Sequence, residues 1–205
     1  RYMEESGDQC DFLKVDTDGS DFATLKGAET LLDSGCLLGV QIECQFHGST
    51  HPNANTFSNI DQFLRSKGYT LYDIDCWRYS KRELPKPFCY SLAAQTFEGQ
   101  IQWADALYLQ DSFSHEGSLD RLVEKGEEHR ALLLIALFDL FGLSDCSAAL
   151  IVRLQGRGVS LPGIDFETLL DLEVPENRWG IVKYRDYIGK FKEDPTLFYP
   201  NALHR

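Results

Sequence analysis

Residues 11–28 limit what this chain of 205 residues can fold into more than any other segment does. A short apolar stretch at 12–15 predicts a strand, and an acidic turn at 16–19 follows it directly. Apolar residues then recur at helical spacing through 21–34, and the apolar run at 38–46 predicts a buried strand. Together they predict a right-handed βαβ unit, and hence an α/β fold. The acidic turn lies where open α/β sheets bind ligands, at the carboxyl end of a strand.

The acidic turn holds two carboxylates and a glycine, Asp16, Asp18 and Gly19. A carboxylate at the end of a strand can accept a proton from a bound hydroxyl group or hydrogen-bond a ligand. The competing interpretation is structural, because aspartate often caps the helix that follows such a turn. Spacing alone favours the structural interpretation, since short motifs match by chance.

Glu43 lies near the end of the second predicted strand, where an unpaired carboxylate is costly. It either faces a ligand or pairs with a lysine such as Lys14. His47, in the loop that follows, is a candidate general base or substrate contact, or else a surface histidine. Glu43, His47 and His51 have the spacing of metal ligands on a helix, which would suit a metal-dependent hydrolase. A strand followed by a loop does not provide that geometry, so no metal is predicted.

The same segment carries a family resemblance. Phe-Leu-Lys-Val-Asp-Thr-Asp-Gly at 12–19, an acid at Asp21 and Leu-Lys-Gly-Ala at 25–28 together resemble the signature of FkbM-type methyltransferases. Three later segments continue the resemblance in the same order, at 41–46, 57–71 and 104–108. The similarity covers about residues 10–111. Ser20 and Asp21 depart from the family pattern, which commonly has an aromatic residue and a glutamate there.

The resemblance implies a Rossmann-like class I methyltransferase sheet, represented by its fourth to seventh strands, mostly parallel with an antiparallel edge pair. It implies S-adenosyl-L-methionine as cofactor and O-methylation of a hydroxyl group on a sugar, a glycan or a small-molecule natural product. Asp16, Asp18 and Gly19 would contact the cofactor. Asp16, Glu43 and His47 would serve catalysis, by positioning or deprotonating the acceptor.

The family's Gly-rich cofactor turn has no counterpart ahead of residue 10. We therefore interpret the chain as the carboxyl-terminal portion of a longer enzyme. The alternative is a catalytically silent binding or assembly module that kept the sheet and lost the cofactor site.

Composition narrows the range of partners and compartments. The net charge of -12 opposes a nucleic-acid surface and disfavours anionic membranes. No apolar run reaches the ~18 residues of a membrane span. Six cysteines without a Cys-x-x-Cys pair suit reduced thiols in a cytoplasmic protein.

The composition changes after residue 111, which predicts two parts, 1–111 and 112–205. The second part reads as a helical extension, with apolar faces that pack on the sheet domain or on a second copy of the chain in a homo-oligomer. Within the first part, 76–102 reads as a long insertion between two strands. Its aromatic residues, including Trp77 and Tyr79, suit a lid or a sugar-stacking platform.

Overall fold

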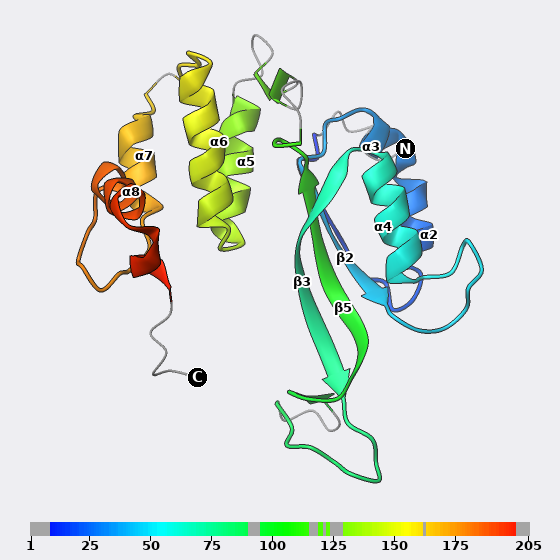
Figure 1. Cartoon of the computed structure of the whole chain (residues 1–205). Coiled ribbons are helices and arrows are strands. Elements are labelled where there is room, and N and C mark those ends of the chain that lie inside the picture. The colour runs from blue at the N-terminus through cyan, green and yellow to red at the C-terminus, as the bar shows by residue number, and fades with distance from the viewer. Residues whose placement is uncertain are drawn as a thin grey trace. The chain divides into compact units, whose positions relative to one another are not determined.

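The computed structural model describes residues 9–89, 95–114, 119–120, 122–123, 129–161 and 163–199. The chain divides into two compact units, Arg1–Asp111 and Ser112–Arg205. The first unit combines a sheet with helices, and the second contains helices (Figure 1). The predicted mixed α/β fold is therefore confirmed in general form.

The sheet of the first unit has five strands in the order β1-β2-β5-β3-β4. The strands are β1 (Phe12–Val15), β2 (Gly39–Gln45), β3 (Tyr69–Tyr79), β4 (Gln95–Thr96) and β5 (Gln100–Gln110). β1 and β2 are parallel, as the βαβ pattern predicted, and β2, β5, β3 and β4 pair antiparallel along the sheet. Three of the four pairings in this sheet are antiparallel, so the prediction of a mostly parallel sheet with an antiparallel edge pair was wrong. β1 and β2 therefore point their carboxyl ends toward the same edge.

β3 and β5 are longer than the sequence predicted. Residues 76–79 continue β3 and residues 100–102 continue β5, so the interpretation of these residues as an insertion was wrong. Trp77 lies opposite Trp103, and the two rings stack with centroids 4.9 Å apart. Cross-strand aromatic pairs stabilise antiparallel strands, which accounts for the extension.

Three helices cover one face of the sheet (Figure 1). They are α2 (Asp21–Gly27), α3 (Glu29–Asp33) and α4 (Phe57–Ser66). The single helix predicted at 21–34 is broken at Ala28, whose N–H donates to the carbonyl of Leu25 at 3.0 Å. Glycine has low helix propensity, and Gly27 precedes this tightened turn.

The core lies between the sheet and these helices. Alternate side chains of β2 are buried there, and the side chains between them are only partly buried on the opposite face. The core cluster includes Val40, Ile42, Cys44, Ala104, Ala106, Tyr108, Phe22, Leu25, Ile60 and Leu64. This alternation places Glu43 on the face of the sheet away from the helices.

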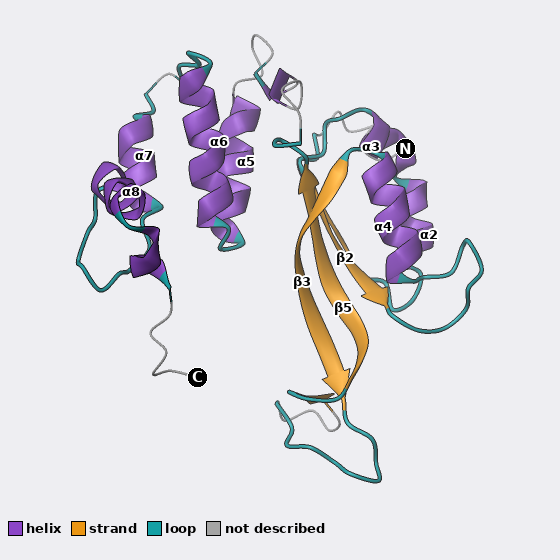
Figure 2. Cartoon of the chain, in the orientation of Figure 1, coloured by secondary structure: helices purple, strands orange, loops and turns teal. Residues whose placement is uncertain are grey.

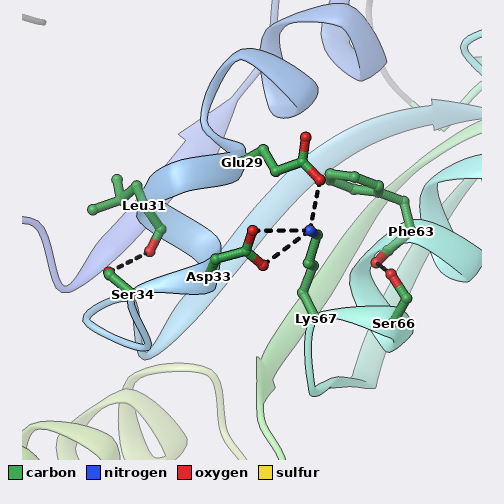
Figure 3. Close-up of polar contacts among 7 residues, drawn as sticks. All are labelled: Glu29, Leu31, Asp33, Ser34, Phe63, Ser66 and Lys67. Atoms are coloured by element: carbon green, nitrogen blue, oxygen red, sulfur yellow. Dashed lines mark hydrogen bonds and ion pairs between the residues drawn. The ribbon is translucent and has the colours of Figure 1, made fainter.

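Lys67, directly after α4, ties that helix to α3 (Figure 3). Its Nζ lies 2.6 Å from Glu29 Oε1 and 2.9 Å from Asp33 Oδ1, and 5.4 Å from the centroid of the Phe63 ring. Hydrogen bonds to the two carboxylates raise the pKa of Lys67 above its ordinary value. These contacts hold α3 and α4 together above the sheet.

The second unit contains α5 (His129–Leu140), α6 (Ser144–Gly156), α7 (Phe166–Leu172), α8 (Tyr184–Glu193) and a 3-10 helix, η2 (Pro195–Phe198). The apolar spacing in the sequence predicts a last helix at 180–191, whereas α8 begins only at Tyr184. Asn177 Oδ1 accepts from the backbone N–H groups of Trp179 and Ile181, which holds the preceding residues in a turn. Within the residues that the structure describes, no helix has the length and apolar character needed to cross a bilayer.

Candidate functional site

Asp21, the first residue of α2, builds the acidic turn. Its fully buried carboxylate accepts hydrogen bonds from Thr17 N at 2.6 Å, from Thr17 Oγ1 at 3.0 Å and from Gly19 N at 3.0 Å. Asp18 and Gly19 have positive φ values of 51° and 99°. Such conformations are costly for a residue with a side chain, so the turn needs the hydrogen bonds that Asp21 supplies.

Asn55 connects the acidic turn to the loop after β2. Its Nδ2 donates to Asp21 Oδ2 at 2.9 Å, and its Oδ1 accepts from Phe22 N at 3.0 Å. A second tie runs from Lys26 Nζ to Asn53 Oδ1 at 2.9 Å. The two loops that carry the predicted site residues are therefore fastened to one another.

Asp16 is exposed at the end of β1. Lys14 Nζ lies 3.6 Å from Asp16 Oδ2, so this lysine pairs with Asp16 and not with Glu43, the partner that the sequence left open. Val15 pairs with Ile42 in the parallel register, which brings Asp16 alongside Glu43. The two predicted carboxylates thus leave neighbouring strands at the same edge of the sheet.

Glu43 is surrounded by negative charge. Partial burial raises the pKa of Glu43 above its ordinary value, and four neighbouring carboxylates add to the rise. In decreasing order of effect they are Asp21, Asp16, Asp105 and Asp18. A carboxyl group with a raised pKa holds its proton more readily at neutral pH, which suits acid–base chemistry.

Asp105, on β5, lies opposite Glu43 in the antiparallel register. Burial raises the pKa of Asp105, the Lys14 cation opposes the rise, and the charge of Asp16 adds to it. We call Asp16, Asp18, Asp21, Glu43 and Asp105 the acidic rim. The rim can accept hydrogen bonds from hydroxyl groups and can stabilise a cation placed nearby.

His47 follows the end of β2 and lines two cavities. One, of about 310 Å³, lies between the His47 loop and the start of α4, and Phe57 and Asn59 contribute to its wall. The other, of about 460 Å³, is lined by Gln45, His47, Tyr79, Lys81, Gln102 and Trp103. Gln45 lines both cavities and lies two residues beyond Glu43 on β2.

The structure brings some of the predicted residues together and leaves others apart. Asp16, Asp18 and Glu43 share one electrostatic environment, whereas neither cavity lined by His47 has a rim carboxylate in its wall. His51 Nδ1 accepts from Asn53 N at 3.1 Å, which is a local loop contact. In the described parts of the chain, no three His, Cys, Asp or Glu side chains gather in a way that could hold a metal ion.

Sequence reasoning named Asp21 only as a departure from the family pattern, and it missed Asn55 and Asp105 as parts of the site. The position of Asp21 at a helix start was a usable signal, because aspartate there commonly bonds nearby backbone N–H groups. Asn55 and Asp105 gave no such signal, since their partners lie far away in the sequence.

Comparison with known proteins gives one family match, and it covers the acidic turn. The family model described as "Methyltransferase FkbM domain" matches residues 2–71. The match includes the strand, the acidic turn, Glu43 and His47, so the predicted resemblance is confirmed there. The segments at 72–111 lie beyond the matched residues. No curated protein and no solved structure matched the chain.

Proposed function

We propose that this chain forms part of an S-adenosyl-L-methionine-dependent methyltransferase that methylates a hydroxyl group of a sugar, a glycan or a small-molecule natural product. One observation carries the proposal: the matched segment, 2–71, contains the turn that Asp21 organises, and this turn presents carboxylates beside Glu43. The proposal includes a Rossmann-like sheet in 1–111 with a separate helical extension in 112–205. It also places the protein in the cytoplasm, where thiols such as its six free cysteines stay reduced.

The chemistry of the rim fits such a cofactor. The cofactor carries a sulfonium cation, and a rim of carboxylates favours positive charge. Gly19 adds access to the backbone, since a Cβ built on it meets nothing within 4 Å. Asp16, Asp18 and Gly19 would therefore hold the cofactor, which supplies the methyl group.

Asp16 and Glu43 would act on the acceptor. The hydroxyl oxygen of the acceptor forms a bond to the methyl carbon as the carbon–sulfur bond breaks, and the hydroxyl proton passes to a base. Asp16 is exposed and stands at the rim, so we assign it this proton. Glu43 orients the hydroxyl group, and His47 contacts the acceptor from the neighbouring loop.

The test is a calorimetric titration of the full-length protein with S-adenosyl-L-methionine, followed by methyl-transfer assays of variants. Asp16→Ala should lower turnover by about 100-fold or more, the usual effect of losing a general base. Asp186→Ala, at an exposed aspartate of α8, is the matched control and should leave turnover unchanged. Unchanged turnover in Asp16→Ala would remove Asp16 from catalysis. Absence of cofactor binding by the full-length protein would favour the silent binding module instead.

A further inference from the structure

The end of the long β3–β5 hairpin differs in character from the rest of the molecule. We call residues 78–89 and 95–100 the arm tip; β2 ends at Gln45, which pairs with Trp103, so the tip extends beyond β2. Figure 2 shows loop beyond the ends of β3 and β5. The tip has its own hydrogen bonds, including Cys89 N to Gln95 O at 3.0 Å and Lys86 N to Ser80 Oγ at 3.0 Å.

Three large apolar side chains are exposed at the arm tip. Leu84 is 71% exposed, Phe97 is 74% exposed and Phe88 is 53% exposed. Exposed apolar side chains that gather in one place generally mark an interaction surface. Here they stand on a protruding loop end and not in a groove, which suits insertion into a deformable partner.

The arm tip is basic, although the chain as a whole has a net charge of -12. Its basic residues are Arg78, Lys81, Arg82 and Lys86, and its acidic residues are Glu83 and Glu98. Lys86 Nζ lies 3.1 Å from Glu98 Oε2, so these two charges offset one another, and the remaining three cations outweigh Glu83. Asp75 on β3 and Asp105 on β5 pair with one another, and Asp75 lies four residues before Tyr79, which belongs to the tip. That separation is roughly 13 Å at ~3.3 Å per residue, longer than the Debye length of about 8 Å.

We infer that the arm tip binds the surface of an anionic lipid bilayer. Cations with interspersed leucine and phenylalanine side chains match a negatively charged headgroup layer over an apolar interior. A nucleic-acid partner is the less suitable occupant, because single-strand binding combines aromatic rings with a positively charged groove that follows the backbone, whereas these side chains stand on a loop end and Leu84 has no ring. The net charge of -12 averages this tip with an acidic body, so it does not describe the tip itself.

Sedimentation of the full chain with vesicles tests this inference and does not require methyl transfer. The vesicles are phosphatidylcholine alone, or phosphatidylcholine with roughly a third phosphatidylserine. We expect binding to the anionic vesicles that weakens as salt is raised. Arg82→Gln should lower the partition coefficient about fivefold, which is the effect of one cation near a charged bilayer. Leu84→Ser should lower it as well, on the same vesicles.

Two matched controls lie in the second unit. Leu172→Ser changes a leucine that is 76% exposed, and Lys192→Gln removes an exposed cation from α8. Both should bind vesicles like the unchanged chain, and urea unfolding midpoints should show that all four variants are folded. Equal binding to neutral and anionic vesicles, or equal losses in the controls, would overturn the inference. Binding to polyuridylate without binding to vesicles would also overturn it, in favour of a nucleic acid.

Discussion

Replacing Asp21 by asparagine keeps the shape of this buried side chain and removes half of its capacity to accept hydrogen bonds. Asp21 Oδ1 accepts from Thr17 N and Thr17 Oγ1, and Oδ2 accepts from Gly19 N and Asn55 Nδ2. In Asp21→Asn, the amide nitrogen faces either Gly19 N and Asn55 Nδ2, which both donate, or Thr17 N and the Thr17 hydroxyl, of which only the hydroxyl can turn to accept. At least one hydrogen bond is therefore lost whichever way the amide turns, and the bonds that remain are no longer assisted by a negative charge.

The expected cost is about 2–4 kcal/mol of unfolding free energy. A hydrogen bond to a charged group contributes about 1.5–3 kcal/mol and one between neutral groups about 0.5–1.5 kcal/mol, so one lost bond and the weakening of the others set an upper range of about 3–6 kcal/mol. Thr17 and Gly19 are exposed, so water recovers part of this loss. Asp16→Asn is the matched control: its carboxylate lies in the same turn but in an exposed ion pair, and the expected change is within about 0.5 kcal/mol.

Urea unfolding followed by circular dichroism measures both variants, and hydrogen exchange of the Thr17 and Gly19 amides reports on the turn directly. Adding Asn55→Asp to Asp21→Asn returns an acceptor to the pair, with donor and acceptor exchanged between the two positions. The double variant should therefore recover about 1 kcal/mol, the contribution of the restored hydrogen bond. Equal destabilisation by Asp16→Asn and Asp21→Asn would refute the reasoning. So would a double variant less stable than the sum of its single changes.

Three further changes test other parts of the structure. Glu43→Gln should raise the unfolding free energy at pH 7 by about 0.5 kcal/mol. The raised pKa of Glu43 means that its charge destabilises the folded chain increasingly as pH rises through that pKa. The gain in unfolding free energy from Glu43→Gln should therefore vanish below pH 4.5, the ordinary pKa of glutamate. Urea unfolding at pH 7 and below pH 4.5 measures this difference. Gly99→Ala should cost about 2–3 kcal/mol, because Gly99 has a φ of 136° and a Cβ there would lie 2.6 Å from the Tyr79 carbonyl oxygen; equal thermal midpoints would contradict this. Iodoacetamide at pH 8 should alkylate exposed Cys36 while Cys44 stays unmodified until the chain unfolds, because burial raises the pKa of Cys44 to about 12; mass spectrometry distinguishes the two sites.

The βαβ unit could be predicted because its signals are local. The strands at 12–15 and 39–45 and the turn after the first of them follow from apolar spacing and from the acidic residues directly after a strand. The full lengths of β3 and β5 could not be predicted in this way. They depend on the stack of Trp77 on Trp103, which forms only once the two strands have paired.

The same contrast between local and long-range signals applies to the residues of the candidate site. Asp16, Asp18 and Gly19 were found because a strand leads directly into an acidic turn, and the matched family segment includes them. Asp105 was missed because its closeness to Glu43 arises from antiparallel pairing across 62 residues of sequence. Two residues that pair across such a long stretch of sequence leave no pattern in a short window of it.

The sequence by itself determined which groups stand at the end of β1, since covalent order fixes the turn after the strand. Only the tertiary structure decided how those groups are charged and held. The raised pKa of Glu43 depends on burial and on carboxylates from three other elements, and the turn depends on Asn55 from a distant loop. Electrostatic fields and hydrogen bonds act through space, so they become definite only when the chain has folded.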